Sequence, residues 1–141
     1  MLKIAKLTDY AVVILSFMAE REQKATAGFI AEKVRLSLPT VAKIMKQLAA
    51  AGLIGSIRGV GGGYKLERSA DDIKLIEVIE AMEGPVALTA CVEGVEHECA
   101  LLQHCPASGR WDMVNNAIRQ ALGDVTLADM ICGRTIEKMR A

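Results

Sequence analysis

The sequence is poor in aromatic residues and lacks any long apolar run. Only five of its 141 residues are Phe, Tyr or Trp, although 52% are hydrophobic. The interior must therefore be built from aliphatic side chains and methionine, a composition that favours packed helices. No apolar stretch approaches the ~20 residues of a membrane-spanning helix. Asp9 interrupts the first apolar stretch, which argues against a signal peptide. We expect a cytoplasmic protein with no membrane partner.

The four cysteines include no closely spaced pair. A Cys-x-x-Cys motif would indicate thioredoxin-like chemistry, and a pair two to four residues apart would indicate a structural zinc site. Neither pattern occurs. The sequence also offers no acid–base set beside a cysteine, which a nucleophilic enzyme requires. We therefore expect the protein not to be an enzyme and to have no small-molecule substrate.

Three cysteines nevertheless lie close together in the chain, at Cys91, Cys99 and Cys105. The gaps of seven and five residues, followed by Pro106, suit an exposed loop whose thiolates hold an iron–sulfur cluster. Cys132 lies apart from this loop, and we interpret it as a spectator. Three thiolates leave a fourth ligand open, and the candidates are His97, His104, Cys132, Asp9 of a partner subunit, or a small molecule.

The formal net charge of zero hides a strong asymmetry. Residues 1–70 hold 11 Lys and Arg against 5 Asp and Glu, a net charge of +6, whereas residues 71–141 hold 6 against 12, a net charge of −6. A basic first half predicts a polyanionic partner for that half alone.

A helix-turn-helix pattern occupies residues 27–51. An apolar stripe predicts one helix over residues 27–34, and a second helix follows with Ser37 as its cap and Pro39 in its first turn. Gly52 is placed to end it. The polar face of the second helix is basic, as expected of a helix that enters the major groove of DNA. The residues of this face are Thr40, Lys43, Lys46 and Gln47.

A β-hairpin is predicted directly after this pair. Residues 53–58 and 64–67 read as short strands, and the turn between them is rich in glycine, from Gly59 to Gly63. A hairpin behind a recognition helix is typical of a DNA-binding wing, with Arg58, Gly59 and Lys65 near the phosphates. A phosphate-binding loop is excluded because no Lys-Ser/Thr pair and no helix follow. A plain hairpin turn without a ligand remains the alternative.

The remaining pattern is helical. We expect a first helix over residues 9–20 capped by Thr8, a fourth helix from Ser69 or Asp71 to Met82, a helix from Ser108 to Leu122, and a short turn capped by Thr126. The fold class is thus mainly α with a small β-hairpin wing. We expect a winged helix-turn-helix domain at 1–83, a cysteine loop at 84–106, a dimerisation helix and short terminal helix at 107–131, and a flexible tail at 132–141.

Several of these motifs together resemble a known family. The run from Arg58 to Tyr64 after a helix-turn-helix, the three cysteines and a Trp-containing helix resemble the winged-helix iron–sulfur regulators of the IscR and NsrR type, most of all regulators of the SUF cluster-assembly operon. The opening Leu7-Thr-Asp-Tyr-Ala11 is also similar. The resemblance implies a homodimer that binds a promoter palindrome in double-stranded DNA and carries a [2Fe–2S] or [4Fe–4S] cluster on Cys91, Cys99 and Cys105.

The resemblance also bears on the fourth ligand. Housekeeping members use a histidine three residues after the last cysteine, where this chain has Ser108. Nitric-oxide-sensing members use an aspartate at the start of the first helix of the other subunit, a position that matches Asp9. Asp9 of the partner subunit is therefore the favoured fourth ligand.

The sequence thus predicts a dimeric repressor of iron–sulfur assembly genes that senses through a bound cluster. Two alternatives remain. The first is a metal-free regulator that responds to thiol oxidation or nitric oxide. The second is an iron–sulfur carrier or electron-transfer protein, which would not need a basic wing.

Overall fold

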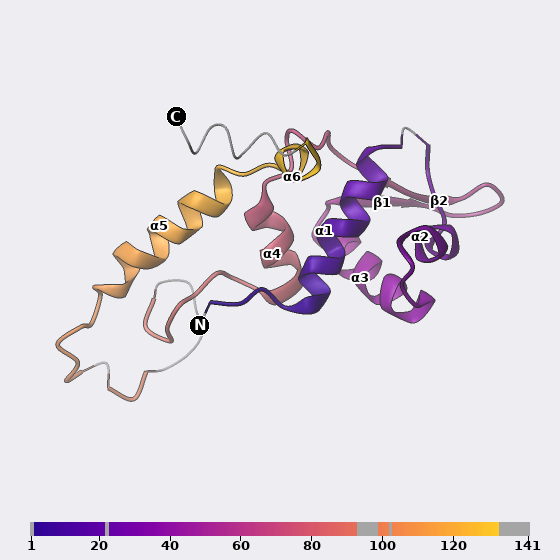
Figure 1. The fold of residues 1–141 in the computed structure, drawn as a ribbon. Coiled ribbons are helices and arrows are strands. Elements are labelled where there is room, and N and C mark those ends of the chain that lie inside the picture. The colour runs from indigo at the N-terminus through magenta and orange to yellow at the C-terminus, as the bar shows by residue number, and fades with distance from the viewer. Residues whose placement is uncertain (1, 22, 93–98, 102, 133–141) are drawn as a thin grey trace.

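The part of the chain that the structure describes consists of helices and one β-hairpin (Figure 1). The structure is a computed structural model, and it describes residues 2–21, 23–92, 99–101 and 103–132. The expected fold class, mainly α with a hairpin wing, is confirmed. The elements in order are α1 (Lys6–Ala19), α2 (Ala27–Val34), α3 (Leu38–Ala50), β1 (Ile54–Ile57), β2 (Gly63–Leu66), α4 (Leu75–Glu83), α5 (Trp111–Gly123) and α6 (Leu127–Cys132).

The core lies among α1, α2, α3 and α4 and is almost entirely aliphatic. Ile14 and Leu15 of α1, Ile30 of α2, and Ile44 and Leu48 of α3 are all fully buried. Each such side chain contributes about 1.5–3 kcal/mol of hydrophobic stabilisation. Their spacing of three and four residues is the one expected for helices that share a single core.

The start of α1 differs from the prediction. Thr8 does not cap the helix, because α1 begins at Lys6 and Thr8 lies fully buried in its first turn. The cap comes instead from the last residue of α4. The Glu83 carboxylate accepts a hydrogen bond from the Ala5 N–H at 3.0 Å and one from the Thr8 hydroxyl at 2.5 Å. A distant side chain therefore satisfies a donor that the helix itself leaves open.

The helix-turn-helix is formed as predicted. The helix α2 spans the expected residues and ends at Arg35, which adopts a left-handed conformation with φ of 56°. Ser37 caps α3 by accepting a hydrogen bond from the Thr40 N–H at 3.3 Å, and Pro39 lies in the first turn. Gly52, with φ of 73°, follows the end of α3.

The hairpin is also confirmed, and it has a third partner that was not predicted. β1 and β2 pair antiparallel, with Ile54 opposite Leu66 and Ile57 opposite Gly63. Beyond this pair, Ala25 forms a bridge with Tyr64 on the other edge of β2. The wing is thereby fastened to the segment between α1 and α2.

Helices α4 and α5 begin later than predicted. Ser69 does not start α4, since its hydroxyl bonds to the Asp72 carboxylate at 2.9 Å in a turn, and the helix begins at Leu75. Asp71 likewise lies in this turn. Ser108 does not cap α5, which begins at Trp111 without a side-chain cap. The prediction for Thr126 is confirmed, because its hydroxyl accepts from the Asp129 N–H at 3.1 Å at the start of α6.

Helix α4 is held at its first turn by charges. The Glu77 carboxylate accepts from the Lys74 N–H at 2.8 Å and pairs with Arg68 at 2.5 Å. The hydrogen bond from Arg68 and the bond from Lys74 lower the pKa of Glu77, while partial burial opposes them. The same pair raises the pKa of Arg68. This anchor, rather than Ser69 or Asp71, sets where the helix starts.

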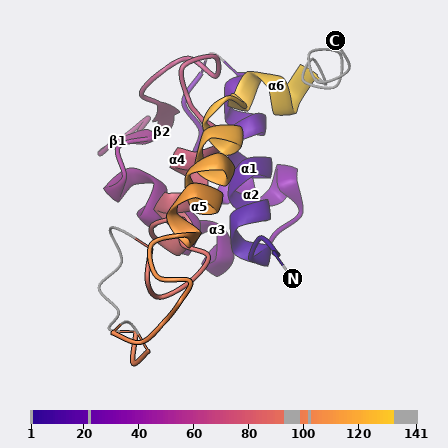
Figure 2. The ribbon, with the colours of Figure 1, turned by 90° about the vertical axis from the view of Figure 1, so that its left-hand side faces the viewer.

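Helix α5 stands at the opposite end of the molecule from the hairpin (Figure 1). The segment that leads into α5 extends beyond the helices in both views (Figures 1 and 2). None of the helices in the described residues is both long and apolar enough to cross a membrane.

Candidate nucleic-acid interface and cysteine loop

The outer face of α3 carries the predicted basic residues. Lys43 and Lys46 are exposed there. Thr40 is half-buried, and its hydroxyl lies 2.7 Å from that of Ser37 as part of the helix cap. Gln47 lies at the margin of the core, and its Oε1 is buried without a hydrogen-bond partner among the described residues. The two lysines are therefore the most accessible of the four.

The hairpin presents three further predicted residues. Arg58, Gly59 and Lys65 are exposed on the wing, and Val60 at its tip is fully exposed. The tip depends on glycine, because Gly59 has φ of 101° and a Cβ on Gly62 would meet the Ile57 carbonyl oxygen at 2.3 Å. The wing can thus turn tightly enough to reach along a neighbouring surface.

A basic hollow between the wing and the start of α2 was not predicted. Its volume is about 560 Å³, and Lys24 and Lys65 face it from two segments far apart in sequence. The bridge between Ala25 and Tyr64 brings these segments together. Nothing in the local sequence around Lys24 indicates that it lies beside Lys65. The lining residues are Gln23, Lys24, Thr26, Gly61, Gly62 and Lys65.

Five cations of α3, the wing and the segment before α2 are exposed. Lys24, Lys43, Lys46, Arg58 and Lys65 form no ion pair within the part of the chain that the structure describes. Exposed and uncompensated positive charge from three elements attracts a phosphate backbone. The arrangement fits a nucleic-acid surface made by α3, the wing and the segment before α2.

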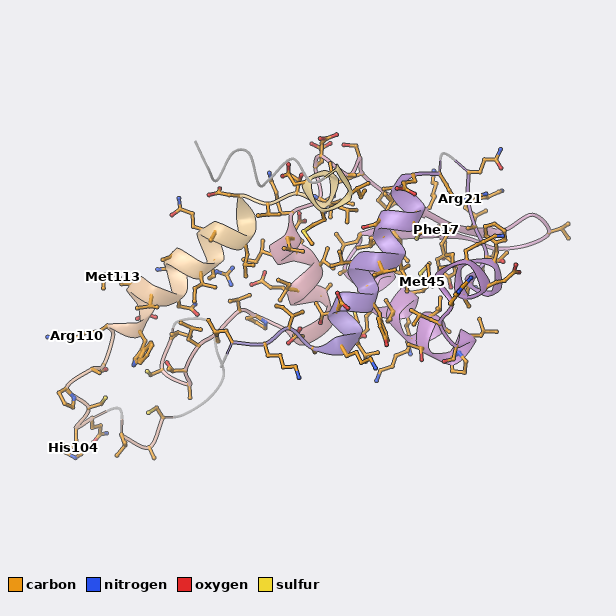
Figure 3. All side chains as sticks on the ribbon, viewed as in Figure 1. Phe17, Arg21, Met45, His104, Arg110 and Met113 are labelled. Carbon is orange, nitrogen blue, oxygen red and sulfur yellow. The ribbon has the colours of Figure 1, made fainter. Side chains whose placement is uncertain are left out.

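A cluster of one arginine and two phenylalanines lies beside the segment that carries Lys24. The Arg21 guanidinium lies 4.8 Å from the ring centre of Phe29 and 5.6 Å from that of Phe17 (Figure 3). The two rings are 6.2 Å apart. Cation–π contacts of this kind stabilise by roughly 0.5–2 kcal/mol. They fix the end of α1 against α2, and so hold the segment that carries Lys24.

The three cysteines lie on the segment between α4 and α5 as free, partly buried thiols. Cys91, Cys99 and Cys105 are all of intermediate exposure, and the Thr89 hydroxyl lies 3.2 Å from the Cys91 sulfur. His104 is exposed, far from the helical core (Figure 3). The predicted candidate His97 and the side chain of Cys132 lie outside the described residues.

The donors in this loop fit an iron–sulfur cluster by type, since thiolates are the ligands that such clusters prefer. In the described residues no three Cys, His, Asp or Glu side chains lie close enough to share a metal. We therefore derive no coordination geometry.

Side chains of α4 and α5 hold the first part of the cysteine loop. Asn115, only 4% exposed, accepts a hydrogen bond from the Leu88 N–H and donates one to the Val86 carbonyl, both at 3.1 Å. The Glu80 carboxylate accepts from the Val86 N–H at 3.3 Å and pairs with Arg119. A polar hollow of about 640 Å³ surrounds these groups.

Asp9 lies apart from these cysteines, on the first turn of α1. It is exposed at the margin of a largely apolar hollow of about 480 Å³. Parts of α1, α4, α5 and α6 form this hollow, including Val12, Leu75, Ile79, Leu122 and Met130.

The apolar residues of α5 differ in exposure along the helix. Ile118 and Leu122 face a hollow beside α4, whereas Val114 is 40% exposed and Trp111 42% exposed. Met113 is 75% exposed (Figure 3). The half of α5 nearer the cysteine loop therefore carries most of its exposed apolar surface.

Comparison with known proteins gives consistent matches along nearly the whole chain. A protein-family model described as "Rrf2: Iron-dependent Transcriptional regulator" matches residues 4–133. The chain is 31% identical to Protein aau3 of Rhizobium meliloti, over 94% of the chain and 87% of that protein. It is 30% identical to the HTH-type transcriptional regulator IscR of Vibrio atlanticus, over 92% of the chain and 75% of that protein.

Solved structures of related regulators are similar to this chain in fold. The structure titled as CymR, the global cysteine regulator of B. subtilis, has a TM-score of 0.68 and 30% identity, and the match covers 93% of this chain and 97% of that one. IscR of T. potens has a TM-score of 0.65 and 30% identity, covering 92% and 86%.

Proposed function

Because the chain belongs to the Rrf2 family, we propose that it is a regulator whose affinity for promoter DNA depends on the state of three loop cysteines. It is a DNA-binding transcriptional regulator, as its relatives are, and not an enzyme. Family membership also favours this reading over the alternative of an iron–sulfur carrier.

One observation carries the DNA-binding part of the proposal at residue level. Exposed cations of α3 and of the wing lack acidic partners among the described residues, and both elements lie towards the end of the molecule opposite α5 (Figure 1). Lys43 and Lys46, with Thr40 and Gln47 beside them, would enter the major groove, where side chains distinguish base pairs. Arg58, Gly59 and Lys65 would contact the adjacent backbone.

The protein would act as a homodimer. Support comes from the exposed apolar residues Trp111, Met113 and Val114 on α5, at the far end from the wing. A two-fold dimer through α5 would cover them and present two recognition helices to a palindrome.

The cysteines Cys91, Cys99 and Cys105 would hold a [2Fe–2S] or [4Fe–4S] cluster, and Asp9 of the partner subunit would supply the fourth ligand. Support comes from the donor type and from the description of the family as iron-dependent. When bound, the cluster would supply a group that is sensitive to oxidants, nitric oxide and iron supply. The protein would be located in the cytoplasm and would repress the genes of iron–sulfur cluster assembly.

The experiment is anaerobic purification followed by iron and sulfide analysis and a DNA-binding titration. We expect bound iron and sulfide in the wild type, none in C91A/C99A/C105A, and a reduced content in Asp9→Ala. Cys132→Ala is the matched control and should retain the wild-type content. Unchanged DNA affinity after removal of the iron would exclude the switch.

A metal-free thiol regulator is the second candidate. The likeness to the global cysteine regulator CymR of B. subtilis favours it, as do the three free thiols. Protein that lacks iron after anaerobic purification, yet changes its DNA affinity on thiol oxidation, would support this candidate instead.

A further inference from the structure

The two buried polar side chains of the described residues both bind the same short connection. Thr8 is fully buried and Asn115 is 4% exposed, while the other buried residues there are hydrophobic. Thr8 bonds to residue 83, and Asn115 bonds to residues 86 and 88. Residues 83–88 join the end of α4 to the part of the cysteine loop that carries the thiols, which begins at Cys91. A buried polar group without a partner costs about 1–3 kcal/mol, so both contacts constrain this connection.

At one end, the connection is fixed to the DNA-reading half. The Glu83 carboxylate binds the Ala5 N–H and the Thr8 hydroxyl at the start of α1. Ile14 and Leu15 of the same helix belong to the core that also contains α3. Any displacement of residue 83 therefore acts on the helix against which the recognition helix packs.

At the other end, the connection is fixed to α5. The Asn115 amide binds a backbone N–H with its oxygen and a backbone carbonyl with its nitrogen, as a neighbouring strand would. Only two residues, Thr89 and Ala90, separate Leu88 from Cys91. The Asn115 amide is therefore the last described side-chain anchor from α5 before the first thiol.

A third contact joins the two ends. Glu80 of α4 accepts from the Val86 N–H at 3.3 Å and pairs with Arg119, which lies one helical turn beyond Asn115 on α5. Gly84 begins the connection with φ of 86°, and Pro85 follows it. Hydrogen bonds to α1, α4 and α5 therefore hold this short connection in place.

We propose that Asn115 is a positioning residue that transmits the state of the loop thiols to the DNA-reading domain through residues 83–88. This inference rests on the proposed function, since it requires that the thiols influence DNA binding. A change at Cys91 would displace residues 86–88 relative to Asn115, and Glu83 would pass the displacement to Thr8 and α1. Coupling of this kind is a free energy between two sites and is measurable as a ratio of affinities.

The test measures this ratio in the full chain. In a Cys132→Ala parent, the dissociation constant for a DNA duplex selected by the wild-type protein from a random-sequence pool is determined before and after alkylation with iodoacetamide. Coupling typically changes an affinity by about 5–150-fold. We expect at least roughly a fivefold change in the parent and less than about a twofold change in Asn115→Ala. The affinity of the unalkylated variant should stay close to that of the parent.

Matched variants separate coupling from a merely structural effect. Asn116→Ala, at the exposed neighbour, should keep the parental ratio. Asn115→Asp retains the oxygen that accepts from Leu88 but loses the donor to Val86, so its ratio should be intermediate. Thr8→Val removes the contact to Glu83 at the other end of the connection and should also reduce the ratio. Combining it with Asn115→Ala should reduce the ratio no further.

Each outcome decides the matter. A parental ratio in Asn115→Ala would overturn the inference and leave the proposed function intact. A parent that does not respond to alkylation would also overturn the inference, while iron removal tests the proposed function separately. If Asn115→Ala shows no cooperative thermal unfolding, Asn115→Asp and Thr8→Val decide, and unchanged ratios in both would overturn the inference.

Discussion

Ala25 and Tyr64 exchange two backbone hydrogen bonds across 39 residues of sequence. The Tyr64 N–H donates to the Ala25 carbonyl at 2.8 Å, and the Ala25 N–H donates to the Tyr64 carbonyl at 3.0 Å. This closely bonded pair joins the segment before α2 to the second edge of β2 through an isolated bridge. It therefore fixes the wing relative to the helix-turn-helix and places Lys24 beside Lys65.

Gly63→Ala should detach the wing. Gly63 has φ of 154°, and an added Cβ would lie 2.9 Å from the Ala25 carbonyl oxygen. We expect a loss of about 1–3 kcal/mol in the free energy of unfolding, with weaker DNA binding. Urea unfolding measures the first quantity. Gly28→Ala is the control, because open space surrounds it in α2 and it should be neutral or stabilising by up to about 1 kcal/mol. Equal stability of the two variants would contradict the expectation.

Lys24→Ala should weaken DNA binding without altering sequence preference. A lysine that contacts a phosphate releases counterions, so its loss should lower the slope of log affinity against log salt by roughly one. Titration at several salt concentrations measures this slope. Arg110→Ala, near α5 and far from the wing (Figure 3), should leave the slope unchanged. An unchanged slope in Lys24→Ala would remove the basic hollow from the interface.

Lys43→Ala should instead relax specificity. Lys43 is exposed on the face of α3 that is expected to meet base edges. Losing one base contact costs about 1–3 kcal/mol of discrimination at one position of the site. Selection of bound duplexes from a random pool, compared with Lys65→Ala, would measure it. The Lys65 variant should bind all sequences more weakly and keep the preference.

Met113→Glu should dissociate the homodimer. Met113 is 75% exposed on α5, and a charge there would oppose burial against a second copy. Light scattering after size-exclusion chromatography measures the mass. Val60→Glu makes the same kind of change at the tip of the wing and should leave the mass unchanged. A dimeric Met113→Glu protein would exclude α5 as the centre of the interface.

Glu77→Gln should destabilise the protein most at neutral pH. The hydrogen bond from Arg68 lowers the pKa of Glu77 in the folded state. The ionised Glu77 therefore contributes to the free energy of unfolding at pH values above its unfolded-state pKa of about 4.5, and this contribution is lost as pH falls through the lower folded-state pKa. Since the pair is partly exposed, we expect a loss of only about 0.5–1 kcal/mol at pH 7. The difference from wild type should shrink towards zero in acid, which urea unfolding at pH 7 and in acid would measure. Glu20→Gln, at an exposed acid, should change stability by less than about 0.5 kcal/mol at pH 7.

The helix-turn-helix and the hairpin could be predicted because their signals are local. Ser37 caps α3 through a bond to Thr40 three residues away, and the glycines of the wing tip meet a steric demand set by their immediate neighbours. The loop of three cysteines was equally visible in the sequence. Its spacing predicts a shared site, but shared ligation depends on positions in space.

Contacts between distant segments decided the rest. Glu83, 75 residues from Thr8, caps α1, and the backbone of Tyr64 brings Lys24 into the basic surface. Nothing in the local sequence distinguishes Asn115, and only folding buries it against residues 86 and 88. The sequence by itself determined where α2, α3 and the hairpin form, because the capping and steric demands of these elements act over a few residues. The tertiary structure decided which side chains connect distant elements. A hydrogen bond between residues far apart in the chain leaves no periodic pattern in the sequence from which it could be predicted.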